Sequence, residues 1–178
     1  ISEIYFAKSN VYLKISQLQN AKTALETGLR IEPNNHNAIF QLGNILLKEK
    51  NYMQAIKLFD QSIQIKPDFW QAINNKGLAY FEKNNINLSI KLFEKAISIE
   101  DNAEPLLGLA SCLRIKDIEL ALQFAKKALS KDPNYVSYDY RKEQLWGEKL
   151  QISTEILLQN EQLQTDVILA KSKINSSS

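Results

Sequence analysis

The stretch HNAIFQLGNILLKEKNYMQAIKLFDQSIQIKPDF, residues 36–69, decides the fold of this chain. Its apolar and small residues fall at helical spacing in two runs, with Leu42 and Gly43 in the first and Ala55 and Phe59 in the second, and a short polar turn separates the runs. The same pattern returns about 34 residues upstream and again downstream, which is the period of stacked helix pairs. The chain is therefore predicted to be a repeat protein built from helical hairpins.

Two features of this stretch predict how its helices pack and end. Gly43 and Ala55 are small, and a larger side chain between two helices would push their axes beyond the usual separation of about 8–10 Å. We therefore expect Gly43 and Ala55 to contact each other. Pro67 lacks a backbone N–H and has a fixed φ, so it should end the second helix.

The stretch resembles the tetratricopeptide repeat, whose pattern is a large residue, Leu-Gly, an aromatic, Ala, an aromatic, Ala and a closing Pro. The matching residues are Leu42, Gly43, Ala55, Phe59 and Pro67, and the substituted ones are Ile39 and Leu46 for aromatics and Ser62 for Ala. The resemblance implies an all-α fold, a right-handed solenoid of helical hairpins, and a role in binding other proteins.

The repeats predict the organisation of the whole chain. We expect a solenoid over residues 1–134, with repeats at about 2–35, 36–69, 70–103 and 104–134, then C-terminal capping helices over 135–174 and a disordered tail at 175–178. In repeat four either Gly108 or Ser111 can take the place of Gly43. The alignment on Ser111 keeps that repeat in phase with its predecessor and puts Pro105 in the first helical turn, where its missing N–H is harmless.

Residues 138–158 are predicted to form one longer helix that covers the exposed end of the last repeat. Two apolar stripes support this helix, namely Leu145, Ile152 and Ile156 on one side and Trp146, Leu150 and Leu157 beside them.

Composition narrows the class of protein. The 178 residues carry a net charge of only +2, and just three of the 22 basic residues are arginine, so nucleic acid is not an expected partner. The single cysteine excludes an intramolecular disulfide, which favours an intracellular compartment. No apolar run of about 18 residues occurs, so these residues should not span a membrane. Because the chain begins at Ile1, we expect that a tag, targeting segment or anchor preceded it.

The sequence contains no combination of residues that catalysis requires. His36, the only histidine, falls at a helix start, and Cys112 has no histidine within its repeat. No metal-binding spacing, Gly-rich phosphate loop or acidic calcium loop is present. The prediction is a protein that is not an enzyme and needs no cofactor or metal.

In tetratricopeptide solenoids the first helix of each pair lines the concave face, so the resemblance implies a binding groove there. Residues of the first helices that lie outside the packing stripes are the candidates for partner binding: Phe6, Asn10, Asn37, Phe40, Gln41, Asn44, Gln71, Asn74, Asn75 and Phe81. This lining is rich in amides and almost free of charge. Amides donate and accept hydrogen bonds, so they suit the backbone of a bound peptide. The alternative is that an AT-rich genome enriches the whole chain in Asn, Ile and Lys, which would give the same lining without a binding role.

The same lining argues against one activity of the family. Members that act as co-chaperones hold a C-terminal carboxylate with a clamp of lysine, arginine and asparagine. Here those places are occupied by Phe6, Asn10, Gln41, Gln71 and Asn75, of which only Asn10 matches. Without the cations a carboxylate would be desolvated with no charged partner, so binding of chaperone tails is not expected.

A finer resemblance rests on residues 140–158. This stretch is similar to the C-terminal helix of the small tetratricopeptide proteins of cyanobacteria and algal plastids that are implicated in photosystem I assembly. It implies a scaffold on the stromal or cytoplasmic side of the thylakoid membrane, with photosystem I subunits or assembly intermediates as partners. The alternatives are a solenoid that self-associates through its end helices and a general chaperone adaptor without a carboxylate clamp.

Overall fold

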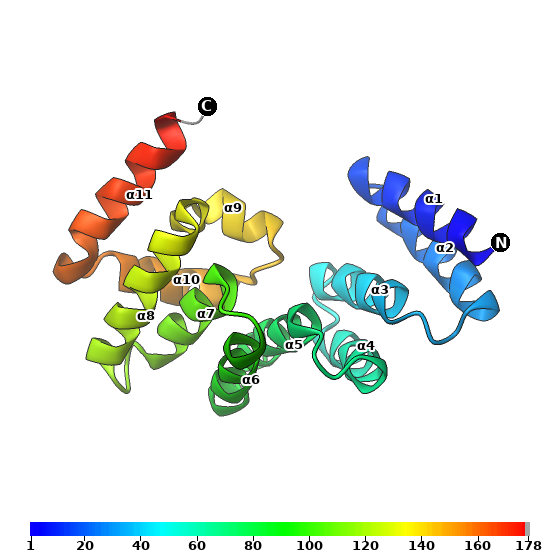
Figure 1. The fold of residues 1–178 in the computed structure, drawn as a ribbon, viewed down its shortest axis with the longest axis horizontal. Helices are drawn as coiled ribbons and strands as arrows, with labels where there is room; N and C mark the ends of the chain where they lie inside the picture. The colour runs from blue at the N-terminus through cyan, green and yellow to red at the C-terminus, as the bar shows by residue number, and fades with distance from the viewer. Residues whose placement is uncertain (177–178) are drawn as a thin grey trace. The chain divides into compact units, whose positions relative to one another are not determined.

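A computed structural model describes residues 1–176, and all regular structure within that range is helical. The first 131 residues form helices that succeed one another in pairs joined by short turns (Figure 1). Their bounds are α1 Ser2–Lys14, α2 Leu18–Ile31, α3 His36–Lys48, α4 Tyr52–Ile65, α5 Trp70–Glu82, α6 Ile86–Ile99, α7 Ala103–Leu113 and α8 Ile118–Lys131. The predicted all-α solenoid of helix pairs is confirmed.

The turns inside the first three pairs repeat at the level of the backbone. Ser16, Lys50 and Asn84 stand 34 residues apart, and each has a left-handed φ of 58°, 60° and 62° respectively. In the second pair the following residue, Asn51, donates its N–H to the carbonyl of Leu46 at 2.8 Å, which closes the helix end as a Schellman motif does. The repeat therefore has the same turn geometry each time, although none of these residues is glycine.

The chain divides into two compact units, which we call unit 1 (residues 1–76) and unit 2 (residues 77–178), with the boundary inside α5. In unit 1, α1 packs on α2, α3 packs on α4, and α2 packs on α3. A Cβ added to Gly43 would stand 2.6 Å from the ring of Phe59, and its three nearest atoms would all belong to that ring. The ring of Phe59 is therefore the side chain nearest to Gly43, and the contact between Gly43 and Ala55 stays a prediction.

In unit 2 the ring of Phe93 on α6 lies against two glycines, Gly77 of α5 and Gly108 of α7. Gly43 and Gly77 are each the eighth residue of their helix, and the eighth residue of α7 is Ala110, which is fully buried. Ser111 stands 34 residues after Gly77, but α7 begins one residue earlier than the repeat period places it. Counting from the helix start therefore differs by one residue from counting by the period, and the alignment of repeat four stays a prediction.

The predicted long helix over residues 138–158 is wrong, because the chain bends in the middle of it. Helix α9 runs from Tyr138 to Glu143 and α10 from Glu148 to Leu158, and between them Leu145 has a left-handed φ of 67°. The bend separates the two predicted stripes. Trp146, Leu150 and Leu157 are buried, whereas Ile152 and Ile156 are about half exposed.

The remaining C-terminal elements cover the last helix pair. A 3-10 turn, η1 Pro133–Val136, follows α8, and after α10 come η2 Glu161–Leu163 and α11 Gln164–Ser176. Helix α11 packs on α8 and η1 through buried Val167 and Ala170, while α10 packs on α7 (Figure 1). Residues 175 and 176 belong to α11, not to a tail, and residues 177–178 lie outside the described range.

Candidate functional site

The predicted binding residues occupy repeating places on the first helix of each pair. Each predicted residue is the second, fifth, sixth, ninth or twelfth residue of α1, α3 or α5, counted from the helix start. We call the surface formed by these places the first-helix face. Helix α7 has 11 residues, whereas α1, α3 and α5 have 13 each, so the same count identifies its places only up to the ninth.

In unit 1 the exposed places of this face hold two asparagines, the glutamate Glu3 and the alanine Ala7. Asn10 on α1 and Asn37 on α3 are exposed, and Gln41 and Gln71 are half-buried. Gln41 Oε1 lies 3.5 Å from the hydroxyl of Ser9, at the limit of a hydrogen bond. All four amide side chains are thus at least partly accessible to solvent.

Three other predicted amides bond to one another. Asn74 Nδ2 donates to Asn75 Oδ1 at 3.0 Å, and Asn75 Nδ2 donates to Asn44 Oδ1 at 2.8 Å. Asn74 is fully buried and Asn75 is 7% exposed, so neither side chain can reach a partner in this conformation. In this conformation the three amides bond α3 to α5, and their role in partner binding stays a prediction. Asn74 Oδ1 is the one buried side-chain oxygen without a partner among the described residues.

The predicted phenylalanines also belong mainly to the packing. Phe6 lies so close to Gly28 of α2 that a side chain at residue 28 would collide with its ring. The ring of Phe40 lies 5.9 Å from that of Phe59 and 4.9 Å from that of Phe69, centroid to centroid. Phe6 and Phe40 are half-buried, so each still presents an edge on the first-helix face of unit 1. Phe81, in unit 2, is 7% exposed.

On α7 the first-helix face is occupied by the C-terminal segment of the same chain. Hydrogen bonds hold this contact. Trp146 Nε1 donates to Glu104 Oε1 at 3.1 Å, and Ser111 Oγ and Thr154 Oγ1 share a bond of 2.7 Å. Arg114 Nε donates to Ser153 Oγ at 2.9 Å, and Ser153 Oγ donates to the carbonyl of Ser111 at 2.9 Å. Counted from the start of α7, residues 104 and 111 stand at the second and ninth places, and residue 114 follows the end of the helix. Trp146 and helix α10 thus contact places on α7 that correspond to predicted binding places on the earlier first helices.

The start of α10 is held by a residue at the end of α5. Gly147, the N-cap residue, has no side chain that could bond to the first helical N–H groups. Glu82 supplies the missing acceptor, with its carboxylate accepting from the backbone N–H of Lys149 at 3.3 Å and of Leu150 at 3.0 Å. These are the second and third N–H groups of α10, which a local cap residue normally satisfies.

A buried arginine joins α9 to α10. Arg141 is fully buried, donating from Nε to Gln151 Oε1 at 2.8 Å, from Nη1 to the carbonyl of Tyr135 at 2.7 Å, and from Nη2 to the carboxylate of Glu155. Burial lowers the pKa of this guanidinium, and the nearby Glu155 carboxylate opposes that shift. The sequence did not reveal the role of Arg141, because a single arginine among charged residues is expected to be exposed to solvent.

The reactive residue types found in the chain serve packing. The ring of His36 lies edge-on to that of Phe69, with centroids 5.2 Å apart. Cys112 is 6% exposed, and burial raises the pKa of its thiol, so the nucleophilic thiolate is not formed near neutral pH. Within residues 1–176 no group of three or more potential ligands could hold a metal, and no helix has the length and apolar character needed to cross a membrane.

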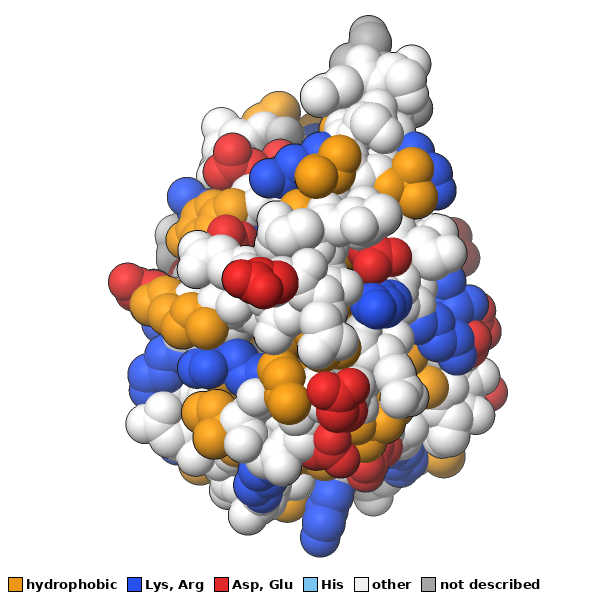
Figure 2. Space-filling view, turned by 90° about the vertical axis from the view of Figure 1, so that its left-hand side faces the viewer, with side chains coloured by type: hydrophobic (Ala, Val, Ile, Leu, Met, Phe, Trp, Pro, Cys, Tyr) orange, Lys and Arg blue, Asp and Glu red, His pale blue; other side chains and the backbone are white. Residues whose placement is uncertain are grey.

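The surface charge has no dominant sign on the face that Figure 2 presents. Basic and acidic side chains alternate there, and hydrophobic side chains form separate small areas. Such a mixture gives no continuous basic track along which a nucleic-acid backbone would bind.

The comparisons with known proteins agree with this geometry. The tetratricopeptide repeat family matches residues 36–69, and a second profile of the same description matches residues 2–35 and 71–102. Together these matches cover more than half of the chain. No curated protein sequence matches it.

Several solved structures share the fold. MamA from Desulfovibrio magneticus RS-1 is 17% identical, with a TM-score of 0.69 over 98% of this chain and 93% of that one. The first TPR of Spaghetti (RPAP3), bound to the HSP90 peptide SRMEEVD, is 17% identical, with a TM-score of 0.62 over 64% of this chain and 91% of that one. A mutant O-GlcNAc transferase from Thermobaculum terrenum is 16% identical, with a TM-score of 0.68 over 76% of this chain but 27% of that one.

At these identities the likeness shows the fold alone. Family membership rests instead on the three matched repeats, which coincide with α1–α2, α3–α4 and α5–α6. The chain therefore belongs to the tetratricopeptide repeat family.

Proposed function

We propose that this chain is a protein-interaction scaffold whose first-helix face in unit 1 binds a segment of a partner polypeptide. The observation that supports this proposal is the contact between α7 and α10. On α7 the second and ninth places bond to Trp146 and to Thr154 of α10, in the same chain. The corresponding places on α1 and α3 include Asn10 and Asn37, whose side chains are exposed.

The chemistry of this face favours an uncharged stretch of backbone as the ligand. An asparagine or glutamine side chain offers both donors and an acceptor, so Asn10, Asn37, Gln41 and Gln71 can bond to peptide N–H and C=O groups. The half-buried edges of Phe6 and Phe40 add apolar contact for the partner's side chains. The similar RPAP3 structure is bound to a peptide, so this fold can hold a peptide, although SRMEEVD carries charges that the ligand proposed here does not.

A double substitution of the two exposed asparagines tests the proposal. Each hydrogen bond contributes about 0.5–1.5 kcal/mol, so Asn10→Ala combined with Asn37→Ala should weaken partner binding by about five- to a hundredfold. The partner is first captured from an extract of the native compartment, and its binding fragment is then titrated against both proteins at low and high salt. Affinity should fall only modestly with salt, because the contact depends little on ion pairs.

The matched control replaces two exposed asparagines elsewhere in unit 1, Asn34→Ala and Asn51→Ala. This variant should bind like the wild type. Equal affinity of the Asn10 and Asn37 variant and the wild type would remove the site from the first-helix face, and binding abolished by salt alone would point to a charged surface instead. Self-association, the alternative role of a solenoid, predicts dimers or larger species of the pure protein in light scattering.

We propose further that the scaffold is not an enzyme. Among the described residues the single histidine and the single cysteine are both engaged in packing, and burial keeps the thiol protonated. Binding without chemistry is the activity that this set of side chains supports.

Photosystem I subunits or assembly intermediates at the thylakoid surface are the partners that the resemblance of residues 140–158 implies. The matched family and structures give this narrower assignment no support, so the resemblance is its whole basis. Capture experiments with thylakoid extracts test it directly. Recovery of photosystem I subunits by wild type but not by the Asn10 and Asn37 variant would support it, and their absence from both would dismiss it.

A further inference from the structure

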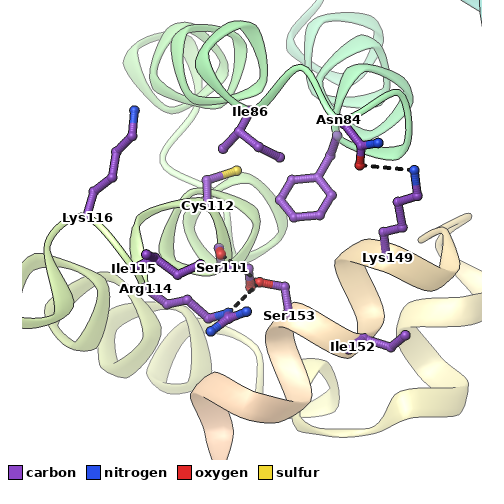
Figure 3. Close-up of a pocket in the computed structure, with 11 residues that line it drawn as sticks. Asn84, Ile86, Ser111, Cys112, Arg114, Ile115, Lys116, Lys149, Ile152 and Ser153 are labelled. Carbon is purple, nitrogen blue, oxygen red and sulfur yellow. Dashed lines mark hydrogen bonds between the residues drawn. The ribbon is translucent and has the colours of Figure 1, made fainter.

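A pocket of about 460 Å³ lies beside α10 in unit 2. Its walls come from the end of α5, the start of α6, the end of α7 and the outer side of α10 (Figure 3). Phe81 and Cys112, 7% and 6% exposed, form an apolar floor, and Ile86 extends it. Ile115 and Ile152, 80% and 54% exposed, form an apolar rim.

Three cations surround this apolar space, and no carboxylate lines it. Figure 3 shows Lys116 and Lys149 on opposite sides of Cys112, with Arg114 between α7 and α10. Lys116 Nζ donates to Asn87 Oδ1 at 2.7 Å, and Lys149 Nζ donates to the carbonyl of Glu82 and to Asn84 Oδ1. These acceptors are neutral, so they leave the positive charge without a counter-charge.

Arg114 completes the set. Its Nε bonds to the hydroxyl of Ser153 at 2.9 Å, again a neutral acceptor. None of the three cations forms an ion pair with another described residue. The Glu82 carboxylate nearby is 6% exposed and accepts from the N–H groups of α10, so it faces the helix start. The pocket therefore combines an apolar floor with a basic rim.

We propose that this pocket binds a partner polypeptide through one bulky apolar side chain flanked by aspartate or glutamate residues. The apolar side chain would cover Phe81 and Ile152, and the flanking carboxylates would pair with Lys116, Lys149 and Arg114. A polypeptide fits better than an enclosed small molecule, because the rim is open and Ile115 stands largely in solvent. Charge complementarity favours an acidic segment, since none of the three cations forms an ion pair with a described carboxylate.

This site goes beyond the proposed function, which concerns unit 1 and an uncharged ligand. The two sites are separable by experiment. Variants of Asn10 and Asn37 should leave binding at the pocket unchanged, and variants of the pocket should leave binding at the first-helix face unchanged. Binding at the pocket should also weaken with salt, because it depends on ion pairs.

A display library of random dodecapeptides is the probe. Selection on the wild-type chain should enrich peptides in which a Leu, Ile, Phe or Met is flanked by acidic residues. Synthetic fluorescein-labelled copies of the enriched peptides are then titrated by fluorescence anisotropy. Lys116→Glu and Ile152→Glu should each weaken binding by about tenfold or more, since each reverses or inserts a charge at the contact.

Matched controls exist on α11. Lys171→Glu and Ile168→Glu change an exposed lysine and an isoleucine that is 65% exposed, and neither should alter the affinity. Because Ile152 and Lys116 are exposed, the pocket variants should retain the wild-type circular dichroism and melting temperature. Enriched peptides without acidic residues, or equal affinity for the pocket variants and the wild type, would overturn the proposal. Binding of laurate with no peptide enrichment would overturn it in favour of a lipid site.

Discussion

Replacement of Glu82 by alanine tests whether the C-terminal segment is fixed by long-range capping. The carboxylate is 6% exposed and accepts two backbone N–H groups at the start of α10, whose own N-cap residue is a glycine. Glu82→Ala would leave both N–H groups without an acceptor inside the fold. Loss of a helix cap costs about 0.5–2 kcal/mol, and loss of the charge at a helix N-terminus costs about 0.3–1 kcal/mol.

We therefore expect Glu82→Ala to lower the free energy of unfolding of unit 2 by about 2 kcal/mol. Release of a buried charge from desolvation keeps the loss from being larger. For a chain of this size the melting temperature should fall by about 4–8 °C. Glu82→Gln retains one acceptor oxygen and the side-chain shape, so its loss should be about half as large.

The assay is urea unfolding followed by the fluorescence of Trp146, which is 4% exposed and packs close to Tyr135. Replacing Trp70 by phenylalanine in every protein leaves Trp146 as the only tryptophan. Glu94→Ala, which changes an exposed glutamate on α6, is the control and should have little effect. Equal midpoints for Glu82→Ala, Glu94→Ala and their parent would refute the capping role.

Three further predictions concern packing and reactivity. Ala55→Leu should overpack the fully buried position of Ala55 and lower the free energy of unfolding by about 1–3 kcal/mol. Lys57→Leu, at an exposed position, should not, and an equal shift of both melting temperatures would show that the repeat register is wrong. Arg141→Met should lower the free energy of unfolding by about 2–3 kcal/mol, which is less than for a fully buried ion pair because the Glu155 side chain is partly exposed and can turn to solvent. A urea midpoint equal to that of the wild type would contradict the buried network. Because burial raises the pKa of the Cys112 thiol, its reaction with Ellman's reagent should stay slow from pH 7 to pH 9 in the folded chain and become fast in urea. A reaction rate that rises steeply with pH in the folded chain would indicate an accessible thiolate.

The helix pairs could be predicted from the sequence because the signals that specify them are local. Gly43 and Phe59 lie within one repeat, and the copies 34 residues away reproduce both the helix lengths and the left-handed turns at Ser16, Lys50 and Asn84. Family membership follows from the same periodicity. Each pair is specified by residues close together in the chain, so no knowledge of distant contacts was needed.

The candidate site could be predicted only in part. Counting along the repeat predicted that Asn10 and Asn37 lie on an exposed face, and both side chains are exposed. It could not show that Asn44, Asn74 and Asn75 bond to one another. Whether an amide faces solvent or another amide depends on how closely two first helices approach. That distance is set by packing between repeats, which periodicity does not report.

The C-terminal segment was decided by the tertiary structure. Residues 138–158 have the local character of one helix, yet the chain turns at Leu145 because contacts on both sides of the bend compensate for the broken helix. Arg141 draws α9 and α10 together, and Glu82, distant in sequence, caps the new helix start. Helical periodicity specified which residues could share a face, whereas long-range hydrogen bonds to buried charges determined where the helix ended and which face it covered.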